Sequence, residues 1–345
     1  MRKKLVGILF CMLMILSTIV PASATILSEK TSHPLAKGNT LYVGGLGPNN
    51  YTKIQDAVNA SSNGDTVFVY DDSSPYYENV VVDKSITLIG EDKQTTVICY
   101  VGGNNAPIFL QADGVTVQRF TMSRSFYGIR IESNDCIIED NIITANVVGM
   151  YIFKGNNILV EGNVISNNSD GVYISLTKDN VISGNIISFN TCHGVNLGTG
   201  RTLVTLNNIS NNGQDGIMIG GDNNTILKNN IVNNGLYGIN IWNSRRNSML
   251  QNNIYNNRWG NARVEVDLWL SLLRSPFDHT WDGNYWGRLY QFPKAIMGRK
   301  YLILPTLIIQ NWIQNHFTEI IPIGIYIPVI KFDRHPAKEP YDIPR

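Results

Sequence analysis

The chain has 345 residues, of which 43% are hydrophobic and 16% are charged, with a formal net charge of +1 and a mean hydropathy of -0.07. This balance excludes a disordered chain, which needs low hydrophobicity and high net charge, and a multi-span membrane protein, which is far more apolar. A general nucleic-acid binder is also excluded, because neutralising phosphates requires a basic excess. Asparagine is unusually frequent, with 41 residues gathered mainly in the middle of the chain, and this suggests a repeated backbone geometry.

Residues 1–24 have the features of a secretory signal peptide. Three basic residues at 2–4 precede an apolar run over 5–20, and residues 21–24 (PASA) form an A-x-A-like cleavage site. We expect cleavage after Ala24 rather than a retained anchor, because the apolar run is short for a membrane span. The mature chain would then be extracytoplasmic (secreted, at the cell surface or in the periplasm), with no stable membrane span.

Residues 25–100 are expected to form an N-terminal cap and the first turns of a solenoid. Residues 51–60 predict a short amphipathic helix with Ile54, Ala57 and Val58 on one face. Runs rich in β-branched residues at 66–70, 80–82 and 86–89 predict strands.

Residues 101–261 contain a repeat with a period near 22 residues, which is visible in two columns. The glycine column is Gly128, Gly149, Gly171, Gly194, Gly216, Gly238 and Gly260, and the asparagine column is Asn141, Asn163, Asn185, Asn208, Asn230 and Asn253. Alternating apolar residues follow each glycine, as at Ile129 and Ile131, and this alternation is typical of strands. Leucine-rich repeats have a similar length, but their leucine signature is absent.

The pattern therefore predicts an all-β fold, a single-stranded parallel β-helix with about 22 residues per turn and turns stacked about 4.8 Å apart. The asparagines would stack and bond the backbone at a corner, so that leucine in place of a mid-stack asparagine would cost about 1–3 kcal/mol. The glycines are expected to supply a bend or a positive φ where the chain turns into the next strand.

The period is lost over residues 262–345, where tryptophan, proline and long apolar stretches appear. We expect a C-terminal cap region here, fastened by Asp278, His279, Asp282 and the Trp-rich segment near Gly283. Polar residues within the apolar stretches, at 310–319, disfavour a C-terminal membrane anchor.

Several segments resemble a known group of proteins. YTKIQDAV (51–58), GDTV (64–67), YENV (77–80) and ITLIG (86–90) resemble the N-terminal region of pectin-lyase-like β-helix proteins. The repeats resemble the carbohydrate-binding and sugar-hydrolysis β-helix domain of the NosD family, and GNYWG (283–287) is similar to a segment that follows such repeats in microbial cell-surface proteins. The resemblance covers about residues 40–290 and implies a right-handed parallel β-helix. It transfers no catalytic residues, because the catalytic segments of pectin methylesterases have no counterpart here.

The NosD resemblance also implies a copper-related role as one alternative. A copper site requires clustered histidine, methionine or cysteine ligands. The histidines are scattered without ligand spacing, at His33, His193, His279, His316 and His335. The sequence therefore predicts no metal site and no cofactor.

The residue before each glycine forms a column that contains candidate catalytic groups. If the column faces solvent, Asp170, His193 and Asp215 align, and the two aspartate backbones lie two turns apart, about 9–10 Å. Inverting glycosidases separate their carboxyl groups by about 6.5–9.5 Å to admit a water. His193 could act as a general base or orient one carboxylate. The alternative interpretation is structural, because aspartate before glycine is common in turns.

Aromatic residues near this column are candidates for binding sugar rings, because flat aromatic faces suit the apolar C–H faces of sugars. They are Tyr151, Phe153, Tyr173, Tyr237, Trp242 and Trp259. We therefore expect a protein that binds extracellular or envelope polysaccharide. The alternatives are an inverting polysaccharide hydrolase or lyase that uses the three residues above, a structural envelope protein without a ligand, and a NosD-like copper-related periplasmic protein.

Overall fold

The computed structural model describes residues 38–102, 106–267, 278–287, 294–303, 324–333 and 335–343. The predicted signal peptide at 1–24 and the polar residues at 310–319 lie outside the described residues. In the described part of the chain, no helix is both long enough and apolar enough to cross a bilayer.

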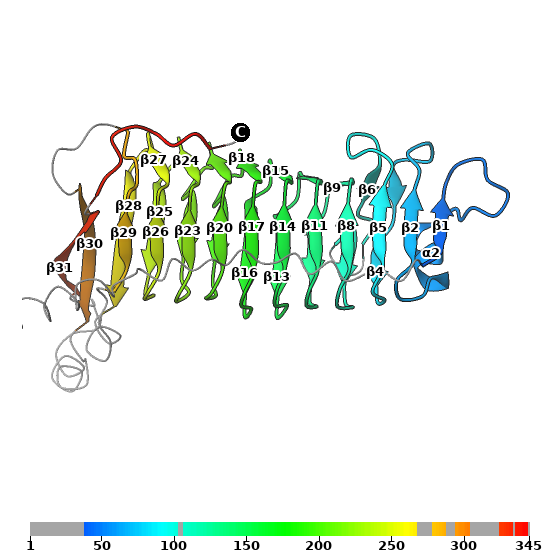
Figure 1. The fold of residues 1–345 in the computed structure, drawn as a ribbon, viewed down its shortest axis with the longest axis horizontal. Helices are drawn as coiled ribbons and strands as arrows, with labels where there is room; N and C mark the ends of the chain where they lie inside the picture. Colours follow the sequence, from blue (N-terminus) through cyan, green and yellow to red (C-terminus); the bar gives the residue numbers. More distant parts are fainter. Residues whose placement is uncertain are drawn as a thin grey trace, which may run out of the picture. The chain divides into compact units, whose positions relative to one another are not determined.

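The described chain winds into three sheets that run side by side along one axis, as Figure 1 shows. Sheet A contains β1 (Thr40–Val43), β2 (Thr66–Val69), β5 (Thr87–Gly90), β8 (Thr116–Gln118), β11 (Ile137–Glu139), β14 (Leu159–Glu161), β17 (Val181–Ser183), β20 (Leu203–Thr205), β23 (Thr225–Leu227), β26 (Ser248–Leu250) and β29 (Thr280–Asp282). Sheet B contains β3 (Tyr76–Tyr77), β6 (Val97–Cys99), β9 (Thr121–Ser123), β12 (Ile142–Thr144), β15 (Val164–Ser166), β18 (Ile186–Ser188), β21 (Asn208–Ser210), β24 (Asn230–Val232) and β27 (Asn253–Tyr255).

Sheet C contains β4 (Val80–Val82), β7 (Ile108–Leu110), β10 (Tyr127–Ile131), β13 (Val148–Phe153), β16 (Asp170–Ser175), β19 (Val195–Leu197), β22 (Ile217–Ile219), β25 (Tyr237–Trp242), β28 (Gly260–Asp267), β30 (Lys294–Ile303) and β31 (Gly324–Asp333). One strand of each sheet makes one turn, and strands β1 to β29 pair in parallel with their equivalents in the neighbouring turns, whereas β30 and β31 at the end of sheet C pair antiparallel. The prediction of a parallel β-helix is therefore confirmed.

The interior is a set of columns of identical or similar aliphatic side chains. The three-residue strands of sheets A and B, such as β11 and β12, point their central residue inward, whereas β19 and β22 of sheet C bury their first and third residues, because side chains alternate between the two faces of a strand. These columns are fully buried: Ile138, Val160, Ile182, Val204, Ile226 and Met249 in sheet A, and Ile143, Ile165, Ile187, Ile209, Ile231 and Ile254 in sheet B. The stacked branched side chains remove apolar surface from water at every turn, at about 25 cal/mol per Å².

Helix α2 (Ile54–Ala60) packs against β1, β2 and β4 at the first turn, and it confirms the predicted helix over 51–60. Its buried residues are Ile54, Ala57 and Val58, as expected. Glu78 satisfies two amides of its first turn, accepting from Ile54 N at 2.9 Å and Gln55 N at 3.0 Å. The Gln55 amide pairs with Val81 through N–H···O contacts of 2.7 and 3.2 Å, so it bonds the outer edge of β4.

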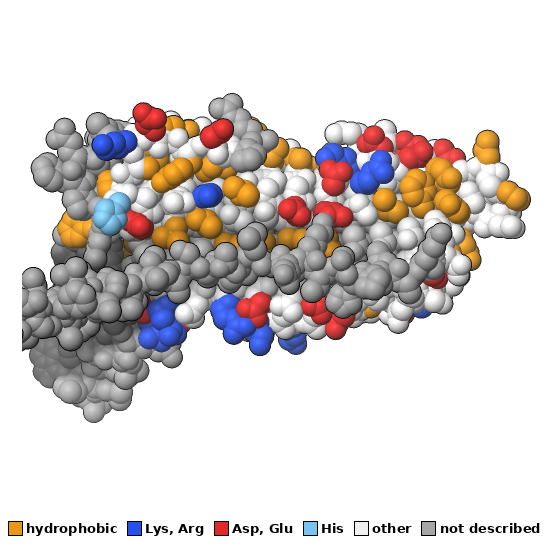
Figure 2. Space-filling model, viewed as in Figure 1, with side chains coloured by type: hydrophobic (Ala, Val, Ile, Leu, Met, Phe, Trp, Pro, Cys, Tyr) orange, Lys and Arg blue, Asp and Glu red, His pale blue; other side chains and the backbone are white. Residues whose placement is uncertain are grey.

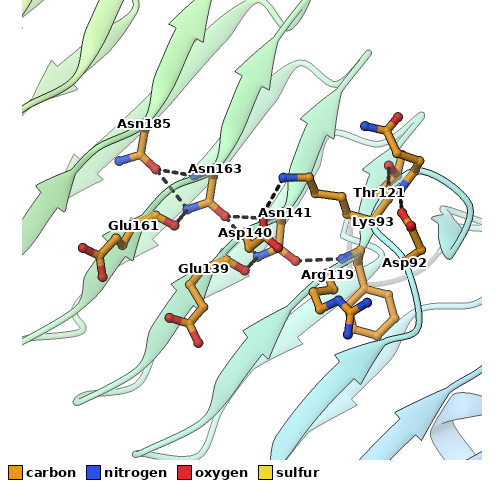
Figure 3. Close-up of polar contacts among 12 residues, drawn as sticks. Asp92, Lys93, Arg119, Thr121, Glu139, Asp140, Asn141, Glu161, Asn163 and Asn185 are labelled. Atoms are coloured by element: carbon orange, nitrogen blue, oxygen red, sulfur yellow. Dashed lines mark hydrogen bonds and ion pairs between the residues drawn. The ribbon is translucent and has the colours of Figure 1, made fainter. Parts of the chain in front are cut away.

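Stacked asparagines occupy the corner between sheets A and B (Figure 3). The side chain of Asn163 is fully buried, and its oxygen accepts from the Asn141 backbone N–H at 2.9 Å and from the Asn141 amide at 3.1 Å. Its own Nδ2 donates to Asn185 Oδ1 at 3.0 Å and to Ile138 O at 2.8 Å. Each amide therefore bonds both neighbouring turns, and the predicted contact between Asn163 and Asn185 is confirmed.

The second half of the predicted asparagine column is wrong by one residue. The buried stack continues through Asn207, Asn229 and Asn252. The predicted members Asn208, Asn230 and Asn253 are strand residues of sheet B, where Asn208 pairs in register with Ile186. The error arises because each position holds an Asn-Asn pair, and a shift of one residue along a strand reverses the face.

Two further stacks, which were not predicted from the repeat, occupy the other corners. Asn146, Asn168, Asn190, Asn212, Asn234 and Asn257 join sheets B and C. Asn180, Thr202, Asn224, Asn247 and His279 occupy successive turns at the corner between sheets C and A.

The residue before each stacked amide has a positive φ. Examples are Asp140 at 54°, Leu206 at 58° and Lys228 at 53°. The predicted glycine column has a different role. It has no left-handed φ between Gly128 and Gly238. A Cβ at Gly149 would lie 2.6 Å from the Gly171 carbonyl oxygen, so these glycines provide space rather than a bend.

The first asparagine stack ends at a carboxylate, near the C-terminal end of the β-helix. Asn284, within the GNYWG segment, continues the first amide stack by accepting from Asn252 N at 3.0 Å. Asp333 of β31 then accepts from Asn284 N at 2.9 Å and from the Trp286 indole N–H at 3.0 Å, while it is fully buried. The predicted contact residues Asp278 and His279 accept backbone N–H groups of Arg246 and Asn247.

Adjacent asparagines give a direct stability test. Asn207→Leu removes the buried amide that bonds Asn185 and Asn229, and we expect it to lower the free energy of unfolding by about 1–3 kcal/mol. Asn208→Leu places the same side chain on the outer face, where the preceding turn carries Ile186, and we expect a change in the free energy of unfolding within about 0.5 kcal/mol. Urea denaturation of both variants measures the difference. Equal destabilisation would contradict the register.

Candidate functional site

The candidate site lies on the outer face of sheet C. Register places the predicted column at one edge of this sheet, where Tyr127 pairs with Val148 and Val148 with Asp170. The neighbouring strand pairs place His193, Asp215 and Tyr237 on the next three turns. Asp170, His193 and Asp215 are therefore aligned along the axis, as the spacing predicts.

The three side chains are linked mainly through the backbone. Asp170 Oδ1 accepts from the His193 backbone N–H at 3.1 Å. The His193 ring nitrogen Nδ1 lies 3.5 Å from Asp215 Oδ2, but the two groups are not aligned for a hydrogen bond. The imidazole is thus placed beside a carboxylate without being tightly oriented by it.

Asp215 is the most constrained member of this set. Its side chain is 2% exposed. One oxygen accepts from Tyr237 N and the other from Asn240 Nδ2, both at 2.9 Å. Both carboxylates therefore satisfy a backbone amide of the following turn, which is the structural role expected for aspartate at a strand edge. Of the two carboxylates, only that of Asp170 is partly exposed to solvent.

Aromatic side chains form a continuous cluster at the start of this face. Tyr151 stacks on Tyr127 with ring centroids 4.6 Å apart, and on Phe153 with centroids 5.7 Å apart. Tyr173 lies 5.7 Å from Tyr151, and Phe126 packs edge-on to Tyr127 at 4.7 Å. We call these five residues the aromatic cluster. Tyr127 and Phe126 were not predicted as binding residues, although their aromatic type at the head of a repeat was a usable signal.

Burial raises the pKa of the Tyr151 phenol above its usual value. The hydroxyl therefore stays protonated in neutral solution and can donate a hydrogen bond. Ring stacking fixes its position, so the cluster offers both a flat apolar surface and a polar group.

The remaining predicted aromatics lie about four turns further along the axis. Tyr237 packs edge-on to Trp259 at 6.2 Å, and the Arg263 guanidinium lies 5.1 Å over the Tyr237 ring. Trp242 ends β25 and is 40% exposed. The placement of Trp259 in the column is wrong, because Tyr237 pairs with Gly260 in the next turn. The aromatics thus form two groups rather than one strip.

Uncharged side chains and glycines lie between the two groups, beside the column that holds Asp170, His193 and Asp215. Ser175 occupies an outer position of β16, Asn196 one of β19 and Met218 one of β22. Glycines follow β19 and β22, at Gly198 and Gly220. A Cβ at Gly220 would lie 3.7 Å from its nearest neighbouring atom. The surface is recessed here, because the glycines carry no side chains. We call this part the low surface.

The charges of this face are mostly paired. Arg130 donates to Glu132 and lies 4.5 Å over the Phe109 ring, and Arg263 donates to Glu265. Lys154 lies at the margin, 4.9 Å from the Phe153 ring centre. Asp170 and Asp215 have no lysine or arginine partner among the described residues. The site is therefore neutral to weakly acidic.

The sheets and their register define an all-β parallel β-helix protein. The family model described as periplasmic copper-binding protein (NosD) matches residues 58–289. The chain therefore belongs to the NosD family. No curated protein matches the chain.

Solved structures share the fold at low sequence identity. Alginate lyase from Paenibacillus sp. str. FPU-7 has a TM-score of 0.56 at 13% identity, covering 72% of this chain and 95% of its own. The Azotobacter vinelandii mannuronan C-5 epimerase AlgE6 A-module has a TM-score of 0.52 at 16% identity, covering 68% and 81%. Pectate lyase Pel9A has a TM-score of 0.51 at 14% identity, covering 66% and 75%. Identities at this level establish the fold alone.

The family description raises the question of copper. Copper sites use clustered imidazole, thiolate or thioether ligands. Within the described ranges, no group of three histidine, cysteine, aspartate or glutamate side chains could hold a metal ion. His193 has one carboxylate nearby, and His335 pairs with Asp282 at 2.7 Å elsewhere. The described residues therefore do not fit a copper site.

Proposed function

We propose that the outer face of sheet C binds an extracytoplasmic polysaccharide. The supporting observation is the aromatic cluster, whose stacked rings lie on the outer face of sheet C near the partly exposed carboxylate of Asp170, on the strand that also carries Tyr173. Aromatic rings contact the apolar faces of sugars, and the polar groups at the ring edges bond their hydroxyls. Structural neighbours named as alginate lyase, epimerase and pectate lyase support a polysaccharide as the ligand class.

The spacing of the two aromatic groups favours a chain rather than a single sugar. Tyr151 and Tyr237 belong to strands four turns apart, which corresponds to about 19 Å along the axis. The low surface at Ser175, Gly198 and Gly220 lies between them and would accommodate the intervening units. A polysaccharide would thus lie parallel to the axis, with aromatic contacts at both ends.

The charges favour a neutral polysaccharide over a uronate polymer. Polyuronates carry one carboxylate per sugar and need cations along the site. The arginines of this face are paired, and the two aspartates would repel the polymer. In this respect the proposed ligand differs from those named for the structural neighbours.

Truncation of the aromatic cluster tests this proposal. We expect Tyr151→Ala plus Tyr173→Ala to lower retention on a neutral polysaccharide about tenfold, because two ring contacts are lost. Pull-downs on cellulose, chitin, xylan and mannan, with alginate and polygalacturonate as charged comparisons, provide the measurement.

A second set of stacked aromatics serves as the matched control. Phe68 and Tyr70 pack at 5.0 Å on sheet A, under Tyr42. Figure 2 shows hydrophobic side chains gathered over β1, β2 and β5 on that face. Phe68→Ala plus Tyr70→Ala should leave retention unchanged. Retention of no polysaccharide by the unmodified protein would favour a structural envelope role instead.

Hydrolysis or lysis is the second candidate, supported by two carboxylates two turns apart with His193 between them. If the protein releases reducing sugar, Asp170→Asn plus Asp215→Asn should reduce the rate at least about a hundredfold. Asparagine retains an acceptor for Tyr237 N, so unfolding in urea should change little and serves as the control. Release that persists in the double variant removes these residues from the mechanism.

We also propose that the protein works outside the cytoplasm. The family description names a periplasmic protein, and residues 1–24 have the signal-peptide pattern. N-terminal sequencing of the exported chain should begin at Thr25. An exported chain that still begins at Met1 would be evidence against cleavage.

A further inference from the structure

A cavity of about 350 Å³ lies on sheet B, away from the proposed polysaccharide face. Its floor is the outer surface of β21, β24 and β27, and its wall is the C-terminal segment 340–343. Figure 1 shows this segment, in red, crossing the ends of these turns. The volume is within the range of small-molecule sites.

The floor of the cavity departs from the repeat. In register, the outer positions of β12, β15 and β18 hold Ile142, Val164 and Ile186, but those of β21, β24 and β27 hold asparagines. The buried stack already uses the preceding residue of each Asn-Asn pair. The outer amides therefore take no part in the buried stack, and among these outer positions they occur on the three strands that line the cavity.

One of these amides shows how the column binds a polar group. Asn253 donates to Tyr341 O at 2.8 Å and accepts from Tyr341 N at 2.7 Å, so it pairs with a peptide unit in both directions. It also donates to Asn230 Oδ1 at 2.6 Å. This contact directs the oxygen of Asn230 toward Asn253 and leaves its N–H groups for another acceptor.

The next amide in the column is available to a ligand. Among the residues that the structure describes, the Asn208 side chain makes no hydrogen bond. A group seated in the cavity can therefore both donate to and accept from Asn208, and can accept from Asn230. This mixed capacity matches a hydroxyl group, which also donates and accepts.

The rest of the lining restricts the ligand class. Asp342 is the one charged side chain in the lining, so the described residues offer no cation to bind an anion. Tyr255 and Ile343 provide apolar surface, and Tyr255 is held edge-on against Tyr285 at 5.8 Å. Amides, an aromatic ring and no cation together suit a neutral, polyhydroxylated ring.

We propose that this cavity is a second binding site, which holds one neutral saccharide unit between the outer amides of sheet B and the C-terminal segment. The site is independent of the sheet C face, because it lies on another sheet and shares none of its side chains. Ligand bound here contacts both the repeats and the segment that crosses them, so it joins the two.

The test replaces outer asparagines with the residue types that occupy the same position in earlier turns. Asn208→Ile plus Asn230→Val installs the residue types of the preceding turns, so the fold should be retained. Calorimetry and saturation-transfer NMR with glucose, galactose, mannose and N-acetylglucosamine should detect binding of at least one sugar. The double variant should weaken that binding tenfold or more, whereas Tyr151→Ala plus Tyr173→Ala should not change it.

Glucuronate provides the anionic comparison, and we expect it not to bind. Binding of glucuronate as tight as that of glucose, absence of binding for all four neutral sugars, or unchanged affinity in the double variant would each overturn the proposal. A crystal of the unmodified protein soaked in the bound sugar provides a measurement that needs no variant. Density between Asn230 and Tyr341 is expected, and density confined to sheet C would contradict the site.

Discussion

The structure depends on a side-chain amide that can bond both to the turn before it and to the turn after it. Strand spacing brings equivalent atoms of adjacent turns to about 4.8 Å, and an asparagine at that spacing accepts through oxygen while it donates through nitrogen. Asn163 does both, and it also satisfies the carbonyl of Ile138 inside the corner. Neither leucine nor aspartate could replace it in mid-stack, since one lacks polar atoms and the other lacks donors. The stack ends where only an acceptor is required, at Asp333.

Because the buried columns and the corner amides hold the turns together, the outer faces of the three sheets can differ. The buried columns and corner amides change little from turn to turn, whereas each sheet presents its own outer chemistry. Sheet C carries the aromatic cluster and the aligned Asp170 and His193, sheet A carries an aromatic group near its first strands, and sheet B changes from aliphatic to amide side chains. Outer side chains can therefore differ from turn to turn while the buried columns stay nearly constant.

The proposed site could be predicted only in part. Alignment of Asp170, His193 and Asp215 followed directly from the period, because strand register carries a sequence column into a spatial column. The burial of Asp215 and its bonds to Tyr237 and Asn240 could not be inferred, since they depend on the side chain bending toward the next turn. Trp259 was misplaced because the chain gains one residue before β28, which shifts every later side chain by one position.

The sequence alone determined the parallel β-helix and the short helix within 51–60, because both follow from local periodicity. Tertiary structure decided which member of each Asn-Asn pair faces inward, since the period is the same for both and only stacking against the neighbouring turns distinguishes them. It also decided the contacts that no period encodes. Asp333 meets Asn284 across 49 residues and Tyr341 meets Asn253 across 88, so the closing carboxylate and the cavity exist only once the chain has wound its turns.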